Sequence, residues 1–233
     1  ISAYDMTVSD TLYGPVKRYV SEERLKGMLD YEFTQLVNRL GPQRGKDTRF
    51  FAFCNTVKVK GYRDNGPWHG WVRFQLKPEA KPSDLIIHVR LNDPDHDRQM
   101  KDLGILGVNI LHAVFFKRDR LEEFIESLVD NLDPRLVEID VVRFEGHGFS
   151  MVDNRPFALQ LVQSGLTPAT LFLANGQVAQ AADVLYKRPI VLMRGSFNPV
   201  CNLHLEVMAQ VKKPFLSHIN ETQADRCMEI CEI

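Results

Sequence analysis

The residues most able to carry out chemistry in this chain lie between Gly195 and His204. Gly195 lets the backbone approach a ligand closely, Ser196 offers a hydroxyl group, and His204 offers an imidazole that can donate a proton in a hydrogen bond. Such a set suits a triphosphate that loses pyrophosphate, because nucleotidyl transfer consists largely of positioning and charge stabilisation.

Two flanking segments must position these residues. The short apolar run from Ile190 to Met193 precedes them, and an amphipathic segment that Asn202 can cap follows them. The pattern predicts a strand, a tight loop and a helix. A helix N-terminus that follows such a loop presents unpaired backbone N–H groups and the positive end of its dipole, and both favour phosphate.

The eleven residues GSFNPVCNLHL resemble the first signature of the nucleotidylyltransferases, above all the eukaryotic-type nicotinamide mononucleotide adenylyltransferases. The resemblance implies that His204 stabilises the triphosphate as the catalytic residue, with ATP and Mg²⁺ as cofactors. It also implies a role in NAD biosynthesis. The residues expected to bind the nucleotide are Gly195, Ser196, Phe197, Asn198 and Asn202.

The chain departs from this family at several points. Cys201 stands where the family usually has His, or Thr in the eukaryotic type, and a second signature of the Ile-Ser-x-Thr-x-Arg kind is missing. Only 29 residues follow His204, whereas one βαβ unit takes about thirty. We therefore expect an enzyme fold that is incomplete in this chain, and the alternative function is a non-catalytic binding or assembly subunit of a larger complex, with a protein partner.

A wider resemblance covers roughly residues 8 to 210. Segments such as LKGMLDY at 25–31 and LGILGVN at 103–109 resemble the N-terminal half of long bacterial proteins without an established reaction. Those proteins are described as nicotinamide or nicotinate mononucleotide adenylyltransferase-like and sometimes as TonB-dependent receptors. The receptor description does not fit, because the sequence lacks a series of alternating strands of about ten residues.

Composition limits the classes of function. The 29 basic and 30 acidic residues give a net charge of −1, which disfavours a nucleic-acid partner. The longest apolar region, residues 103 to 116, is too short for a membrane span, which takes about 20 residues. The four cysteines show no disulfide framework, so we expect a reducing cytoplasmic or organellar compartment. Because the chain opens at Ile1, we expect a processed or trimmed form.

The sequence predicts an α+β fold in which an antiparallel sheet with packed helices precedes the opening of a Rossmann-like βα unit. We expect an α+β domain over residues 1–150 and, over 151–233, a helix, a hairpin and the strand-loop-helix, with the boundary near 146–156. Helices are expected over 21–40, 98–116 and 118–132, the second of them buried between layers, and a short fourth helix should follow Asn154 as its cap. Strands are expected over 50–60, 70–76, 85–91 and 136–144. A hairpin with a type I′ turn is expected over 170–180.

Alternation along these strands places one set of cations on a single sheet face: Lys58, Lys60, Arg73, His88 and Arg90. Such a face could bind an anionic metabolite, although a solvated outer face is the more common arrangement. On the opposite face we expect the apolar positions of all four strands, including Val137, Ile139 and Val141.

Other polar clusters have structural interpretations that we prefer. The Trp68 to Trp71 segment is expected in a loop that closes the core, rather than in a base-stacking platform. The acidic run from Asp93 to Asp97 suits a helix cap better than a cation site. We expect His112 to be a satisfied core or edge histidine rather than a ligand, and His147 to be a loop residue without a positioned partner. Cys227 and Cys231 suggest a turn of helix at the C-terminal end rather than a zinc site, so no metal ligands are assigned.

Overall fold

The computed structural model describes residues 22–57 and 67–233. They fall into two compact units, one ending at Ala179 and the other running from Gln180 to Ile233. The division lies C-terminal to the boundary expected near 146–156, because a helix and a short hairpin in between pack on the last strand of the first unit. Each unit is described by itself.

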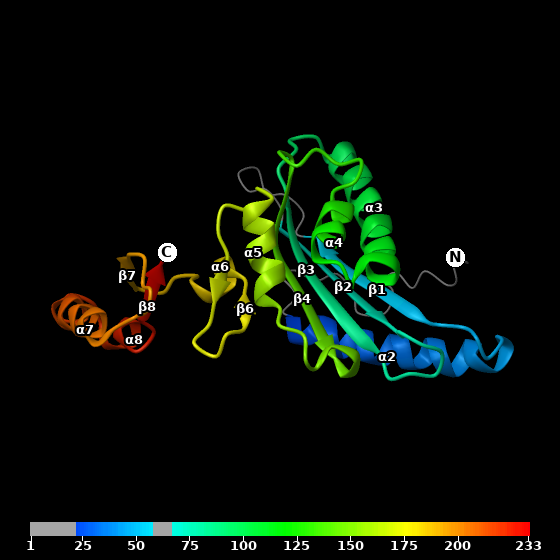
Figure 1. Ribbon diagram of the computed structural model, residues 1–233, viewed down its shortest axis with the longest axis horizontal. Coiled ribbons are helices and arrows are strands. Elements are labelled where there is room, and N and C mark those ends of the chain that lie inside the picture. The colour runs from blue at the N-terminus through cyan, green and yellow to red at the C-terminus, as the bar shows by residue number, and fades with distance from the viewer. Residues whose placement is uncertain (1–21, 58–66) are drawn as a thin grey trace. The chain divides into compact units, whose positions relative to one another are not determined.

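The first unit is built on a four-stranded antiparallel sheet in the order β1-β2-β3-β4, with helices on both faces (Figure 1). The mixed architecture of antiparallel sheet and packed helices confirms the α+β expectation. Its elements are α2 (Glu22–Leu40), a 3-10 turn (Gly41–Gln43), β1 (Phe51–Val57), β2 (Pro67–Phe74), β3 (Ser83–Leu91), α3 (His96–His112), a π-helical turn (Ala113–Lys117), α4 (Leu121–Leu128), β4 (Val137–Gly146), a second 3-10 turn (His147–Phe149), α5 (Arg155–Gln163), β5 (Leu171–Phe172) and β6 (Val178–Ala179).

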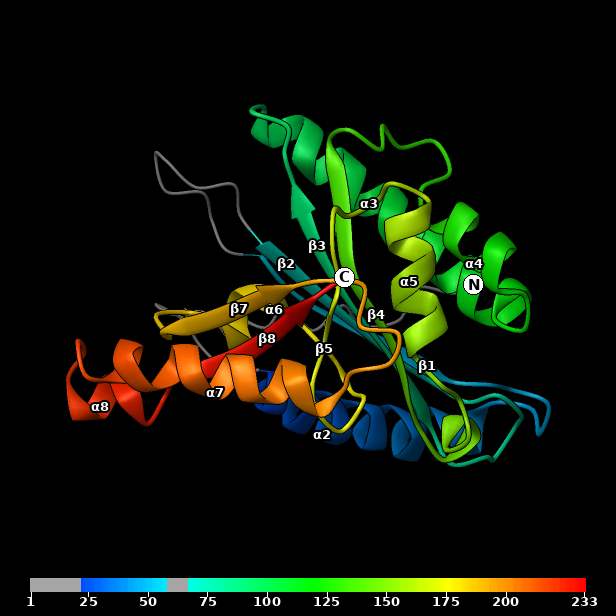
Figure 2. The same cartoon turned by 60° about the vertical axis from the view of Figure 1, so that its left-hand side comes forward.

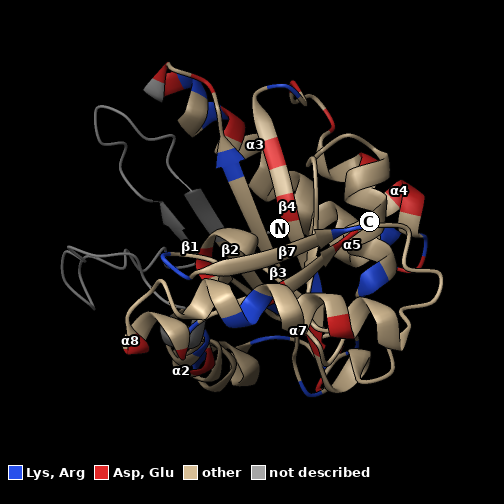
Figure 3. Ribbon diagram, turned by 90° about the vertical axis from the view of Figure 1, so that its left-hand side faces the viewer, with Lys and Arg blue, Asp and Glu red and all other residues tan. Residues whose placement is uncertain are grey.

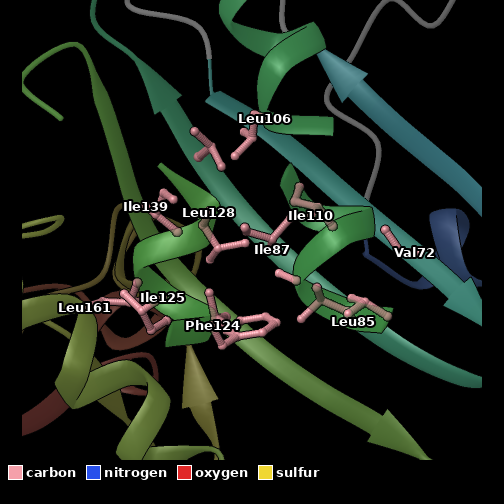
Figure 4. Packing of buried hydrophobic residues seen from close by; sticks show 14 of the residues in the cluster. Val72, Leu85, Ile87, Leu106, Ile110, Phe124, Ile125, Leu128, Ile139 and Leu161 are labelled. Carbon is pink, nitrogen blue, oxygen red and sulfur yellow. The ribbon is translucent and has the colours of Figure 1, made fainter. Parts of the chain in front are cut away.

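The main hydrophobic core lies between one face of this sheet and helices α3, α4 and α5 (Figure 4). Amphipathic spacing explains the helices, since Phe124, Ile125 and Leu128 form one face of α4 and are fully buried. Asp95 begins α3 by accepting a hydrogen bond from the Asp97 N–H at 2.9 Å, which confirms the expected cap. The strands contribute alternate apolar residues, among them Val72, Phe74, Leu85, Ile87 and Val89.

A β-bulge in β4 changes which residues face this core. Val89 pairs with Ile139 while His88 pairs with Val141, so Asp140 is the extra residue between them. Ile139 and Val142 therefore face the core, whereas Val141 packs with Ala158 of α5 and Val178 of β6. The expectation that Val141 shares the face of Ile139 was wrong, because strict alternation does not include an inserted residue.

Within the described residues, α2 packs on the second face of the sheet over β1 and β2, and the expected cations on this face are paired with carboxylates rather than free to bind an anion. Arg73 is 6% exposed and donates two hydrogen bonds of 2.7 Å to Asp84, and it also contacts Asp30 of α2. His88 is 1% exposed and contacts Asp140 through its Nδ1. Arg90 lies 3.6 Å from Glu138 and 3.7 Å from Asp140. Carboxylates thus neutralise these cations, while Lys58 and Lys60 lie outside the described residues.

Three local expectations were also wrong. Residues 68–71 belong to β2 rather than to a loop, and Trp71 is buried against Leu25 and Leu29 of α2. Asn154 is the N-cap residue of α5 as expected, but the expected side-chain cap was wrong, because its side chain bonds the backbone N–H and carbonyl of Phe144, at 2.7 and 2.9 Å. The hairpin turn is not type I′, because only Gly176 has a positive φ, whereas a type I′ turn requires two such residues. The cap expected at Ser21 lies outside the described residues.

The second unit contains α6 (Ala181–Val184), β7 (Ile190–Arg194), α7 (Asn202–Leu216), α8 (Glu221–Ala224) and β8 (Met228–Glu232). β7 and β8 pair in parallel, with Ile190 opposite Met228 and Arg194 opposite Glu232. Figure 2 shows the two strands side by side with α7 beside them. The helix turn expected over Cys227 to Cys231 was wrong, since this segment is the partner strand of β7.

Candidate functional site

The candidate site is the loop of residues 195–201, which leaves β7 at the end where both parallel strands finish. The Gly195 N–H donates to the Glu232 carbonyl at 3.0 Å, so strand pairing continues up to the first loop residue. At the same end the Arg194 guanidinium bonds the Glu232 carboxylate at 2.7 Å. This ion pair lowers the pKa of Glu232 and raises that of Arg194.

His204 is held in place by the start of α7. Cys201 is the N-cap residue, and its backbone N–H donates to His204 Nδ1 at 3.0 Å. This is the reverse half of a capping box, with imidazole in the place of the usual Glu or Gln. Since Nδ1 accepts a hydrogen bond, the neutral ring carries its proton on Nε2, which makes Nε2–H a donor. The expectation that Asn202 caps the helix was wrong by one residue, because Asn202 is the first helical residue.

Two further contacts shape the loop. The ring of Phe197 meets the His204 ring edge to face, with centroids 5.1 Å apart. The Cys201 sulfur lies 3.3 Å from His204 Nδ1, so the thiol and the backbone N–H share one acceptor. Phe197 has a φ of 40°, a left-handed conformation that is unusual for a bulky residue and that often occurs at functional sites.

Glycine at position 195 is not required by packing within the chain. A Cβ atom built there lies 3.4 Å from the nearest atom of the Phe197 ring, which is an ordinary contact. A side chain at this position would pack against the Phe197 ring and would narrow the approach of a ligand to the backbone at the strand end.

The structure brings some of the predicted residues together and leaves others exposed to solvent. Gly195, Phe197 and His204 belong to one contact set with Cys201. Within the described part of the chain, the side chains of Ser196, Asn198 and Asn202 form no hydrogen bonds, and all three are exposed. Arg194 and Glu232 were missed. A cation directly after an apolar strand was a visible signal for Arg194, but Glu232 could be found only by recognising β8.

The described residues contain no candidate metal site made of protein side chains alone. Across residues 22–57 and 67–233 there is no group of three or more His, Cys, Asp or Glu residues that could hold a metal ion. The other histidines considered, His112 and His147, are both exposed, and His112 stacks on Phe116.

Figure 3 shows the two signs of charge interspersed along the ribbons. No helix in the described part is long and apolar enough to cross a membrane.

Comparisons with protein-family models, with curated proteins and with solved structures found no match to this chain.

Proposed function

We propose that residues 190–232 form a Rossmann-like βαβ unit that binds the phosphate groups of a nucleotide of the ATP or NMN type. Ligands of parallel α/β units bind outside the carboxyl ends of the strands, and the loop 195–201 lies at that end of β7 and β8. The observation that carries the proposal is the fixed imidazole of His204, whose Nδ1 is held by the Cys201 N–H while Nε2–H remains as a donor.

The same geometry defines what each group would do. In the first turn of α7, the backbone N–H groups of Asn202 and Leu203 precede the first hydrogen bond of the helix and would donate to phosphate oxygens, whereas the His204 N–H already donates to the Cys201 carbonyl at 3.0 Å. His204 Nε2–H would add a side-chain donor. The described residues contain no carboxylate cluster for Mg²⁺, so the ion would be held through phosphate oxygens and water, as is common for this metal.

If the unit is catalytic, the resemblance to nucleotidylyltransferases implies adenylyl transfer. An oxygen of the acceptor phosphate would attack the α-phosphorus of ATP, the bond to the bridging oxygen would break, and pyrophosphate would leave. His204 and the loop amides would stabilise the charge on the departing group without a proton transfer. We confine the proposal to binding and treat turnover as its next test.

Isothermal calorimetry of ATP, with and without Mg²⁺, tests the proposal. Wild-type protein should bind with a micromolar Kd, and His204→Ala should weaken binding by about tenfold to a hundredfold, the value of one hydrogen bond to a charged group. The matched control is His218→Ala, since His218 is an exposed histidine just past the C-terminal end of α7. Circular dichroism of both variants verifies that the helices remain intact.

Two results would contradict nucleotide binding. One is the absence of any heat of binding in the wild type under both conditions. The other is an equal affinity in wild type and His204→Ala, which would place the nucleotide elsewhere on the protein.

A second candidate function is supported by the exposed apolar side chains of this unit. Leu203, Val207 and Val211 form a stripe along α7, spaced four residues apart, and all three are exposed. On β7, Leu192 is 54% exposed. Water-exposed apolar stripes mark surfaces that bind protein. We infer that this unit also acts as an assembly module, and Val207→Glu with Val211→Glu, which lie farther along α7, should abolish co-purification of a partner without changing the affinity for ATP.

A further inference from the structure

Helix α3 presents an apolar ridge that the other described elements of the first unit leave exposed. Its buried side consists of Leu103, Leu106 and Ile110, whereas Met100, Val108 and Phe116 are 50, 68 and 66% exposed. The exposed residues follow one ridge at intervals of eight residues along α3 and the π-helical turn. The apolar pattern had predicted a helix buried between two layers. Within the described part of the first unit, α3 packs on the sheet through one side only, so the ridge is open to a partner surface.

A groove runs beside this ridge, between α3 and α4, with a volume of 1050 Å³. It is held in shape by the chain itself. The Asn109 side-chain amide donates to the carbonyls of Leu128 and Asp130, at 3.1 and 2.7 Å, and Lys117 bonds Glu123 at 2.5 Å. A groove that is already formed costs little ordering when a partner binds.

Gly104 lies between Met100 and Val108 on α3 and lines the groove. A Cβ atom built at this position meets nothing within 4 Å, so packing within the chain does not require glycine. Glycine is a poor helix former, and its presence on an exposed helical face disfavours the helix. What it provides is room for a second backbone or side chain to approach α3 closely.

The charges around the groove are self-complementary. Lys101 and His112 line it from α3, while Glu126 and Asp130 line it from α4 and the residues after it. Within the described residues, Lys101, Glu126 and Asp130 form no ion pair. A two-fold axis along the groove would set the basic α3 side of one copy against the acidic α4 side of the other. The net charge of −1 adds almost no repulsion between copies.

From the ridge, the groove, the open glycine and the charge pattern, we propose that the chain forms a two-fold symmetric homodimer through α3 and α4. In this dimer the ridge of each copy occupies the groove of the other, with Gly104 at the closest approach. This interface lies wholly within the first unit and does not depend on nucleotide binding.

Sedimentation velocity of the full chain tests the proposal, at loading concentrations of about 1 to 100 µM, which cover the affinities of small interfaces. Wild-type protein should shift from monomer to dimer over this range. Gly104→Arg should weaken the dimer at least tenfold, because the added side chain fills the space left for the partner. The substitution replaces glycine with a better helix former in open space, so the monomer should fold at least as well.

Gly27→Arg is the matched control. Gly27 is an exposed glycine in the interior of α2, and a Cβ atom there also meets nothing within 4 Å. It should leave dimerisation unchanged. Glu126→Lys should weaken the dimer, and Lys101→Glu in the same chain should restore it. A wild type that remains monomeric at every concentration would overturn the proposal, and so would a dimer that Gly104→Arg leaves intact.

Discussion

At the scale of single residues, the second face of the sheet shows how charge is accommodated in an interior. Arg73 and His88 were identifiable as cations on one face, but their partners Asp84 and Asp140 were not assigned to them from the sequence. Each acid lies on the strand next to that of its cation, Asp84 on β3 beside Arg73 and Asp140 on β4 beside His88. Only the register of the folded sheet brings each pair together. Periodicity predicts a face, whereas pairing requires the register and, for Asp140, the bulge.

We predict that Asp84→Ala destabilises the protein by roughly 3 kcal/mol, because it leaves the buried guanidinium of Arg73 without its bidentate partner. Asp30 remains in contact with Arg73, which keeps the loss at the lower end for broken buried pairs. The measurement is urea unfolding followed by circular dichroism.

The control for this prediction is Arg155→Ala, which removes an equally short but exposed bond to Asp153 and keeps the bond from the backbone N–H of residue 155 to Asp153. Its unfolding midpoint should stay close to that of wild type. The double variant Arg73→Met with Asp84→Leu should recover most of the stability, since it removes both charges together. A single Asp84→Ala variant as stable as the wild type would show that Arg73 does not depend on this partner.

At the candidate site, the sequence predicted which residues form the loop, but it predicted their structural roles only in part. Sequence pattern identified the loop, and the strand and helix that flank it were confirmed. The cap, however, is Cys201 rather than Asn202, because the helix begins one residue earlier than the capping preference of Asn suggests. The bond from the Cys201 N–H to the imidazole could not be inferred, since it depends on the rotamer of His204.

At the scale of elements, the long amphipathic segments were the most predictable. Helices α2, α3 and α4 and the four strands of the sheet were all expected, with shifts at their ends. β8 was mistaken for a turn of helix, because its five residues carry little periodic signal and the strand pairs with a segment more than thirty residues away. Short strands of this kind are defined by their tertiary partner rather than by local preference.

The end of β4 provides a prediction at this scale. Gly146 has a φ of 97°, and a Cβ atom built there lies 3.0 Å from the Ser83 Cα and 3.2 Å from the Pro82 carbonyl oxygen. We expect Gly146→Ala to cost roughly 3 kcal/mol, since it combines backbone strain with a collision against backbone atoms that cannot move aside. Thermal unfolding measures the effect.

Gly165→Ala separates strain from collision. Gly165 also has a left-handed φ, 71°, but a Cβ atom there meets nothing within 4 Å. Its loss should be about 1 kcal/mol, the cost of the left-handed conformation alone. Equal losses at the two positions would show that the contacts with Pro82 and Ser83 relax.

At the scale of the whole molecule, the two units differ in how much apolar surface they bury. Between Gln180 and Ile233 the only buried large hydrophobic side chains in the described chain are Val191 and Met208, whereas the first unit has a continuous core. Burial of apolar area is the main source of stability, so the second unit should be the less stable one.

Native-state hydrogen exchange would test this difference. Amides of β7 and α7 should exchange through openings of lower free energy than those of β3 and β4. Because the units are compact separately, substitutions that destabilise the first should leave exchange in the second nearly unchanged. Identical protection in both units would contradict the prediction and indicate cooperative unfolding of the chain.

In the sequence, α3 and α4 lie between β3 and β4, which are neighbours in the sheet, and this order affects the folding rate. β2 and β3 are joined by a short loop, so this hairpin can close within microseconds. The ladder between β3 and β4 must instead close a loop that contains both helices and their turn. Early helix formation would shorten that loop in space, so the nucleus that limits the folding rate should contain the α3–α4 pair together with β3.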